Sequence, residues 1–246
     1  MLKIAIPSYK RATTLGKKTL KVLREEGFLA SDINIFVANQ EEADEYKGAV
    51  DASLYNDIVI GVPTLVAQIK FINNYYPDGT YLVKMDDDIR GFKRLRECHL
   101  PTLFQEAFDY CKKNNIPMWG ISPCDNSRFM KDCWTKGLFN VCGVCYGSLA
   151  RHIQSDIDFK DDWYRSLAGF KEYGTLLKID FLAPKTTYWG GKGGCNVYRT
   201  FDKEKEVADK LLELFPEYIS KIFIKPNGHP DIKLKRFPRV NHYELS

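Results

Sequence analysis

The sequence contains no long apolar run and no strong charge of either sign. No stretch approaches the roughly 20 apolar residues of a membrane-spanning helix, and no signal-peptide pattern opens the chain. The formal net charge is +4 over 246 residues, which allows a polyanionic partner without requiring one. Internal repeats and low-complexity linkers are also absent. We therefore expect a single intracellular domain, residues 1–246, with no membrane partner.

Two enzyme signatures are missing as well. The G-x-x-x-x-G-K-[ST] spacing of a P-loop does not occur, although four glycines surround Lys192. The stretch DDDIR, residues 86–90, lacks the DxDx[TV] arrangement of phosphatases that use an aspartyl nucleophile. The sequence therefore argues against both a P-loop nucleotide site and that phosphatase chemistry.

The seven cysteines are an odd count, without the density of a disulfide scaffold. Cys124, Cys133, Cys142 and Cys145 are a conceivable zinc set. However, Cys142 and Cys145 lie in an apolar run, residues 138–147, that is typical of a strand. Residues three apart in a strand point to opposite faces, so we expect buried thiols rather than zinc.

Strand and helix patterns alternate in the first half of the chain and become irregular in the second. Apolar strands are predicted at residues 3–7, 33–38, 57–61 and 80–85, with helical patterns between them. Later strands are predicted at 118–122, 138–147 and 176–182, and helices from Pro101, over 162–174 and over 202–215. This rhythm predicts an α/β fold with a mostly parallel central sheet flanked by helices and a mixed second half.

Three consecutive aspartates, Asp86, Asp87 and Asp88, follow the predicted strand 80–85. Ligands of open α/β sheets bind outside the carboxyl ends of the strands. Asp86 and Asp88 face the same side of an extended chain, and carboxylates suit Mg²⁺ or Mn²⁺. A solvated acidic turn is the alternative.

The stretch IPSYKRA, residues 6–12, leaves the first predicted strand with a hydroxyl, an aromatic ring and two cations. Ser8, Tyr9, Lys10 and Arg11 suit a nucleotide, with contacts for a base and positive charge for phosphates. The alternative is an ordinary basic entry into a helix.

Together these segments resemble a GT-A glycosyltransferase, in which a DxD-type motif binds a nucleotide-sugar diphosphate through a divalent metal. MDDDI, FKDDWYRSL and TYWGGKGGCNVYR are most similar to the phage and TET/JBP-associated glycosyltransferases. The resemblance implies a GT-A-like sheet, Mn²⁺ or Mg²⁺, a UDP-sugar donor, and 5-hydroxymethylcytosine or 5-hydroxymethyluracil in DNA as acceptor. It also implies a donor-binding half, residues 1–98, an acceptor-binding half, residues 99–246, and the cytoplasm, that of the host cell for a phage protein. Glucose and arabinose are both compatible sugars.

An inverting transfer needs a carboxylate that deprotonates the acceptor hydroxyl. The resemblance implies this role for Asp162 or Asp161 in DFKDDWYRSL, and Asp162 is favoured as the second acid of the pair. The alternative is a helix start that attracts acidic residues through its cap and dipole.

The remaining expected site residues fall into three sets. Donor binding is expected from Pro7, Ser8, Tyr9, Arg11, Asp86, Asp87 and Lys192. Metal binding is expected from Asp86, Asp88 and His229. Acceptor or DNA binding is expected from Trp119, Trp163, Tyr164, Lys233, Lys235 and Arg236.

Each of these expectations has a plain structural alternative. Lys192 suits a hairpin turn, His229 a surface turn, and the three aromatic residues a core. Other functions also remain open: a GT-A enzyme for a protein, glycan or lipid acceptor, a nucleotidyltransferase, or a basic DNA-binding protein without catalysis.

Overall fold

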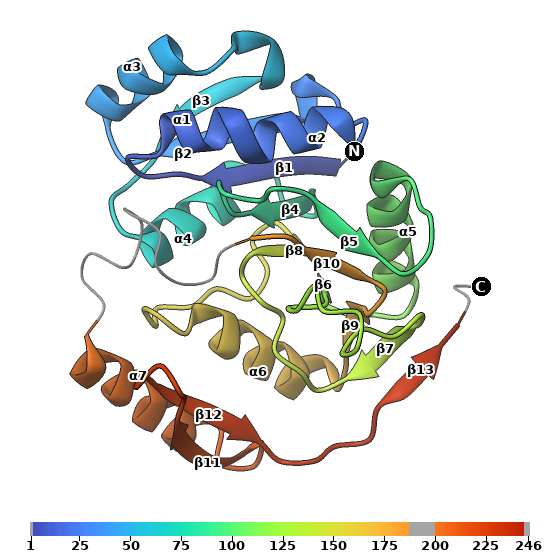
Figure 1. Ribbon diagram of the computed structural model, residues 1–246. Helices are drawn as coiled ribbons and strands as arrows, with labels where there is room; N and C mark the ends of the chain where they lie inside the picture. The colour runs from blue at the N-terminus through green and yellow to red at the C-terminus, as the bar shows by residue number, and fades with distance from the viewer. Residues whose placement is uncertain (1, 187–199, 244–246) are drawn as a thin grey trace.

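The computed structural model describes residues 2–186 and 200–243 (Figure 1). One nine-stranded sheet runs through it in the order β13-β7-β9-β6-β8-β4-β1-β2-β3. Its strands are β1 (Leu2–Pro7), β2 (Ile33–Val37), β3 (Asp57–Ile60), β4 (Tyr81–Met85), β6 (Met118–Ile121), β7 (Trp134–Gly137), β8 (Cys145–Leu149), β9 (Leu176–Ile179) and β13 (Val240–His242).

Two small antiparallel ribbons stand outside this sheet, β5 (Phe92–Arg94) with β10 (Leu182–Pro184), and β11 (Ile219–Ile224) with β12 (Pro230–Leu234). The α-helices are α1 (Ala12–Leu15), α2 (Lys21–Glu25), α3 (Gln40–Ala49), α4 (Leu65–Tyr75), α5 (Leu100–Lys113), α6 (Asp161–Tyr173) and α7 (Phe201–Leu214). A π-helical turn, η1 (Gly16–Leu20), joins α1 to α2, and 3₁₀ turns lie at η2 (Ala30–Asp32) and η3 (Ala52–Leu54).

The first half of the sheet is parallel, as the alternating sequence pattern predicted. β1 pairs in parallel with β2 and β4, and β2 pairs in parallel with β3. In the second half, β8 and β7 run against their neighbours. The prediction of a mostly parallel sheet with a mixed second half is confirmed.

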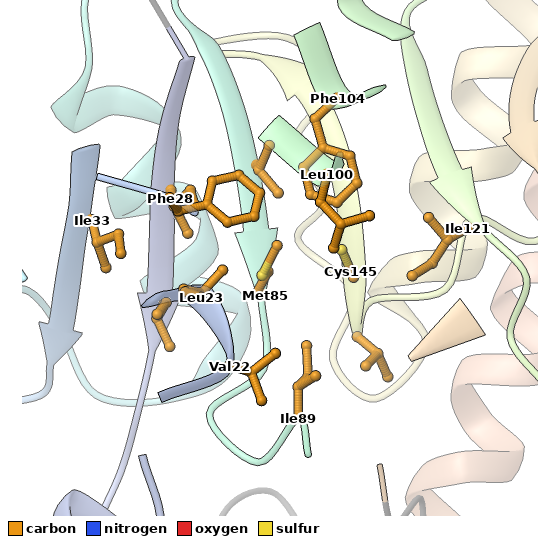
Figure 2. Packing of buried hydrophobic residues seen from close by; sticks show 14 of the residues in the cluster. Val22, Leu23, Phe28, Ile33, Met85, Ile89, Leu100, Phe104, Ile121 and Cys145 are labelled. Carbon is orange, nitrogen blue, oxygen red and sulfur yellow. The ribbon is translucent and has the colours of Figure 1, made fainter. Parts of the chain in front are cut away.

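Successive side chains along a strand point to opposite faces of the sheet, where they pack against different helices. On β1, Ile4 and Ile6 join a large core that includes buried residues of α1, α2 and α5, while Ala5 joins a core with Ile72 of α4. Figure 2 shows the large core, in which Phe28, after α2, lies beside Phe104 of α5, their ring centroids 5.7 Å apart. This alternation is the period of two that a strand covered on both faces requires.

Three expected elements differ from the structure. The predicted strand over 138–147 is a loop up to Val144, with β8 beginning only at Cys145, because Leu138, Phe139 and Val141 are buried in two hydrophobic cores without needing strand pairing. The predicted strand over 176–182 breaks into β9 and β10 around Asp180. The segment after residue 215, for which the sequence pattern predicted no strand, forms β11, β12 and β13.

The C-terminal elements attach to the rest of the fold at two places. α7 and the β11–β12 hairpin share a core with Leu138, which follows β7, and with Leu167 of α6. β13 pairs with β7 and adds the last strand to the main sheet. Among residues 2–186 and 200–243, no helix combines the length and apolarity that crossing a bilayer requires.

Candidate functional site

The three aspartates follow β4 directly, at the carboxyl end of the parallel strands, and their side chains have different surroundings. The backbone N–H of Asp86 donates to the carbonyl of Val144 at 2.9 Å. Asp87 is buried and accepts hydrogen bonds from Ser8 Oγ at 2.6 Å and Arg11 Nη1 at 3.0 Å. Asp87 therefore joins the end of β4 to the loop after β1.

Asp88 points toward a different segment of the chain. Its Oδ1 accepts a hydrogen bond from Thr186 Oγ1 at 2.7 Å, and its Oδ2 lies 3.8 Å from Arg11 Nη1. The β5–β10 ribbon explains this contact, because its pairing brings Lys185 beside Gly91, with a backbone hydrogen bond of 2.8 Å.

The loop after β1 is held by α3. Tyr46 Oη and Ser8 Oγ are 2.7 Å apart, and Tyr46 Oη also accepts from the Arg11 backbone N–H at 3.0 Å. Burial raises the pKa of Tyr46 to about 12, so its hydroxyl stays protonated and donates to Ser8, which donates to Asp87. Lys10 adopts φ 54°, a left-handed conformation, and its backbone N–H donates to Glu42 Oε1 at 3.0 Å. Tyr9 is left 41% exposed, and Lys10 Nζ lies 5.3 Å from the centre of its ring.

Asp86 borders a cavity of about 200 Å³. Burial, followed by the neighbouring charges of Asp87, Asp88 and Asp161, raises its pKa to about 8 against the opposing charge of Arg11. Like charges at short range disfavour ionisation of one another. This crowding is the arrangement that a bound cation would relieve.

The start of α6 brings Asp161 and Asp162 to the same cavity. Asp161 forms an ion pair with Arg165 Nη1, one helical turn further on. Asp162 Oδ2 accepts a hydrogen bond from Asn140 Nδ2 at 2.9 Å. Burial, followed by the charge of Asp161, raises the pKa of Asp162, while Asn140 and Arg165 oppose the shift.

The N-cap of α6 is Lys160, whose side chain makes no capping hydrogen bond, so the two aspartates are first-turn residues. Lys160 is instead turned into the protein. Its Nζ is paired with Glu204 of α7 and lies 2.8 Å from the carbonyl of Pro230. This buried contact fixes the end of the helix that carries the aspartates.

Buried basic and hydroxyl groups form another wall of the cavity. Lys84 of β4 donates to Ser148 Oγ at 2.9 Å, and burial lowers its pKa well below the usual range. The guanidinium carbon of Arg165 lies 4.2 Å from the ring centre of Tyr146. Within the described part of the chain, Nε and Nη2 of Arg165 and the Tyr146 hydroxyl have no hydrogen-bond partner. The cavity thus borders both carboxylates and donors.

The three aromatic residues expected to bind the acceptor substrate lie in or against hydrophobic cores. Trp119 is fully buried between Phe104 and Phe108, and its indole occupies the space where a side chain at Gly147 would stand. Trp119 therefore packs in the core between the sheet and α5, and its place in an acceptor pocket stays a prediction. Trp163 and Tyr164 are partly buried against the C-terminal core.

The C-terminal candidates surround the β11–β12 hairpin. His229 lies in its turn, next to Pro230, whose carbonyl contacts Lys160. Lys233, Lys235 and Arg236 are exposed along and after β12. Lys192 lies outside the described residues.

The candidate metal ligands of this site are the carboxylates of the aspartate triplet. Among residues 2–186 and 200–243, no group of three or more His, Cys, Asp or Glu side chains is arranged to hold a metal ion. The six described cysteines are free. Mg²⁺ and Mn²⁺ commonly take one or two carboxylates and complete their shell with water and substrate phosphates, which the aspartate triplet fits.

Several residues of the site escaped the sequence analysis. Glu42, Tyr46, Asn140 and Arg165 all contact the expected site residues, as does Thr19, which donates to the carbonyl of Asp86. Only Arg165 carried a signal, because its spacing of four from Asp161 is that of a helical ion pair.

The architecture matches solved structures of sugar-transferring enzymes. Glucosyl-3-phosphoglycerate synthase from Mycobacterium tuberculosis, in complex with Mg²⁺ and UDP, superimposes with a TM-score of 0.55 at 10% identity, over 97% of this chain and 87% of that one. Mannosyl-3-phosphoglycerate synthase from Rubrobacter xylanophilus gives a TM-score of 0.51 at 12% identity, over 98% and 86%. The protein has the GT-A fold.

Another solved structure matches this chain over only part of its own length. The chain spans 59% of the length of S. aureus TarS 1–349, at 10% identity, with 74% of this chain covered and a TM-score of 0.48. No protein-family model matches the sequence, and no curated protein matches it. The GT-A fold is thus evident in three dimensions at identities of 10–12%.

Proposed function

We propose that this protein is a metal-dependent glycosyltransferase that uses a nucleotide-sugar donor, a UDP-sugar in the first instance. The observation that carries the proposal is that Asp86, at the end of β4, and Asp161 and Asp162, at the start of α6, border one cavity. Metal-binding and proton-accepting carboxylates need this proximity, because the leaving diphosphate and the attacking hydroxyl meet at one anomeric carbon.

Asp86 and Asp88 are the residues we assign to Mn²⁺ or Mg²⁺, with His229 as a further candidate ligand. The ion, when bound, supplies positive charge for the leaving diphosphate. Asp87 is held by Ser8 and Arg11 and keeps the loop after β1 against the triplet. Pro7, Ser8, exposed Tyr9 and Arg11 form the donor side, together with Lys192, and residues 1–98 form the donor half.

Asp162 is the residue we assign as the base. In an inverting transfer the acceptor oxygen bonds to the anomeric carbon, the bond to the diphosphate oxygen breaks, and the hydroxyl proton passes to the Asp162 carboxylate. Asp161 is paired with Arg165, which leaves Asp162 as the acid supported by a neutral donor, Asn140. Asp161 is the second candidate.

The size of the cavity suits one sugar ring. Its volume of about 200 Å³ lies below the roughly 300–1,000 Å³ of pockets for drug-sized ligands. Carboxylates and buried donors both border it, which suits hydroxyl groups that donate and accept. Arg165 and Tyr146 have donors without protein partners in the described part of the chain.

For the acceptor we propose a hydroxymethylated pyrimidine in DNA, on the sequence resemblance and the exposed cations Lys233, Lys235 and Arg236. Trp163 and Tyr164 adjoin the proposed base and are partly exposed. The deciding assay is a screen of UDP-sugars with DNA containing 5-hydroxymethylcytosine, 5-hydroxymethyluracil or neither. Transfer that requires the hydroxymethyl group supports this acceptor.

A different result from the same screen points to another acceptor. Donor hydrolysis with Mn²⁺ but no transfer to DNA supports a GT-A enzyme acting on a protein, glycan or lipid. Absence of UDP binding and of hydrolysis with every sugar overturns the glycosyltransferase proposal and leaves a nucleotidyltransferase to be tested with nucleoside triphosphates.

A further inference from the structure

Thr19 joins the N-terminal helical segment to both ends of the aspartate triplet. Its hydroxyl donates to the backbone carbonyl of Asp86 at 2.9 Å and accepts from the backbone N–H of Ile89 at 2.9 Å. Thr19 itself is 1% exposed. One buried hydroxyl thus bridges Asp86, the first residue of the triplet, and Ile89, the residue after the triplet.

The local backbone supports this contact. Thr19 lies in η1, the π-helical turn between α1 and α2, and its neighbour Leu20 is buried in the large core. π-Helical turns inside α-helices occur often at functional sites. In this chain the turn belongs to a helical segment whose core residues Leu15 and Leu20 fix it against the sheet.

The triplet is therefore held twice by the same N-terminal segment. Ser8 and Arg11 bind the side chain of Asp87, and Thr19 binds the backbone on either side of it. The contacts of Ser8 and Arg11 do not reach the backbone carbonyl of Asp86 or the backbone N–H of Ile89, although the N–H of Asp86 is bonded to the carbonyl of Val144. The hydroxyl of Thr19 supplies those two contacts, and it has no further proton to donate.

We propose that Thr19 is a positioning residue for the metal and diphosphate site. By fixing the backbone from Asp86 to Ile89, it fixes the directions in which the Asp86 and Asp88 carboxylates leave the chain. The inference rests on the proposed function, because it takes those two carboxylates as the metal ligands. Mutation of residues that orient metal ligands through hydrogen bonds typically weakens metal affinity by about 10–100-fold.

The test compares Thr19→Val with Thr19→Ser in the full chain. Valine keeps the shape of threonine and removes both hydrogen bonds, while serine keeps the hydroxyl. We measure Mn²⁺ affinity by electron paramagnetic resonance and UDP affinity, with and without Mn²⁺, by calorimetry. We expect Thr19→Val to weaken Mn²⁺ binding about tenfold or more, and Thr19→Ser to stay within about twofold of wild type.

Thr135→Val is the matched control. Thr135 is 3% exposed, lies on β7, and hydrogen-bonds Asp180 and Asn241 rather than any residue of the triplet. This variant should lower the melting temperature, because it too removes buried hydrogen bonds, and leave Mn²⁺ affinity unchanged. If Thr19→Val does not fold, Thr19→Ala removes the same hydroxyl with a smaller side chain.

The outcomes separate the two proposals. Wild-type Mn²⁺ affinity in a folded Thr19→Val protein, or equal losses in Thr19→Val and Thr135→Val, overturns the positioning role and leaves the glycosyltransferase proposal intact. Wild-type protein that binds neither Mn²⁺ nor UDP overturns both. Weaker Mn²⁺ binding in Thr19→Val, with near wild-type binding in both Thr19→Ser and Thr135→Val, supports Thr19 as the positioning residue.

Discussion

Nδ2 of Asn140 lies 2.9 Å from Oδ2 of Asp162 and joins the loop before β8 to the start of α6. This hydrogen bond favours the ionised form of Asp162, against burial and the charge of Asp161, which raise its pKa. The pair of residues therefore sets how much of the proposed base is deprotonated.

Asn140→Ala should shift the acid limb of the pH–rate profile to higher pH. Without the amide donor the pKa of Asp162 rises further, and a base acts only when deprotonated, so transfer is lost at low pH and recovers as pH increases. The measurement is the rate of sugar transfer under saturating donor across pH. Asn114→Ala, at an exposed position after α5, serves as control, and an unshifted profile in Asn140→Ala would contradict the role of Asp162.

Asp162→Asn should reduce transfer by about two to four orders of magnitude, the usual worth of a positioned base, with donor affinity near wild type. If the aspartate served only the helix start, the amide would leave transfer near wild type and remove only the interaction of a first-turn charge with the helix dipole, about 0.3–1 kcal/mol. Single-turnover measurements of transfer and calorimetry of UDP binding distinguish a catalytic base from a residue that serves only the helix start.

Asp161→Asn provides the comparison and has a different expected result. It leaves the buried guanidinium of Arg165 without its charged partner, so the melting temperature should fall. Normal transfer in Asp162→Asn together with loss in a folded Asp161→Asn protein would move the base by one residue.

Asp86→Asn should remove the response of the protein to Mn²⁺. In the absence of metal, its melting temperature should equal or exceed that of wild type, because the substitution removes one of several crowded carboxylates. Thermal melts with and without Mn²⁺ measure both effects, and Asp125→Asn in the exposed loop after β6 is the control. A Mn²⁺-dependent rise in melting temperature that survives in Asp86→Asn would argue against this ligand.

Lys160→Ala should destabilise the protein by about 3–5 kcal/mol, the usual result of removing one partner of a buried ion pair. Lys160 and Glu204 are 3% and 2% exposed, so the substitution would leave the buried carboxylate without its charged partner Lys160. Urea unfolding measures the loss. The double variant Lys160→Met with Glu204→Leu should recover much of it, and failure of Lys160→Ala to change stability would contradict the burial argument.

Removing the charges of Lys233, Lys235 and Arg236 together should flatten the salt dependence of DNA binding. Each phosphate contact contributes about 0.9 to the slope of log affinity against log salt, so loss of three contacts lowers it by about three. Fluorescence anisotropy with duplex DNA at several salt concentrations gives the slope. Replacement of exposed Lys47, Lys112 and Lys113 is the matched control, and an unchanged slope in the first variant would place the DNA on another surface.

The sequence by itself determined the parts of the fold that depend on local pattern. Apolar strands separated by helical periods predict a parallel sheet, and an apolar run ending in three aspartates predicts a carboxylate cluster at the end of β4. The helix that begins at Asp161 follows likewise from its own periodicity and from Gly174, which adopts φ 76° at its end. These features need only the chemistry of neighbouring residues.

Only the tertiary structure decided which distant side chains meet. Thr19 and Asp86 are separated by 67 positions, and Asn140 and Asp162 by 22, so no local period links them. Trp119 illustrates the same limit, because an aromatic residue in a strand suits a ligand pocket and a core equally until the packing of α5 against the sheet encloses it. Contacts between elements depend on how the sheet is ordered and covered, and that information is distributed over the whole chain.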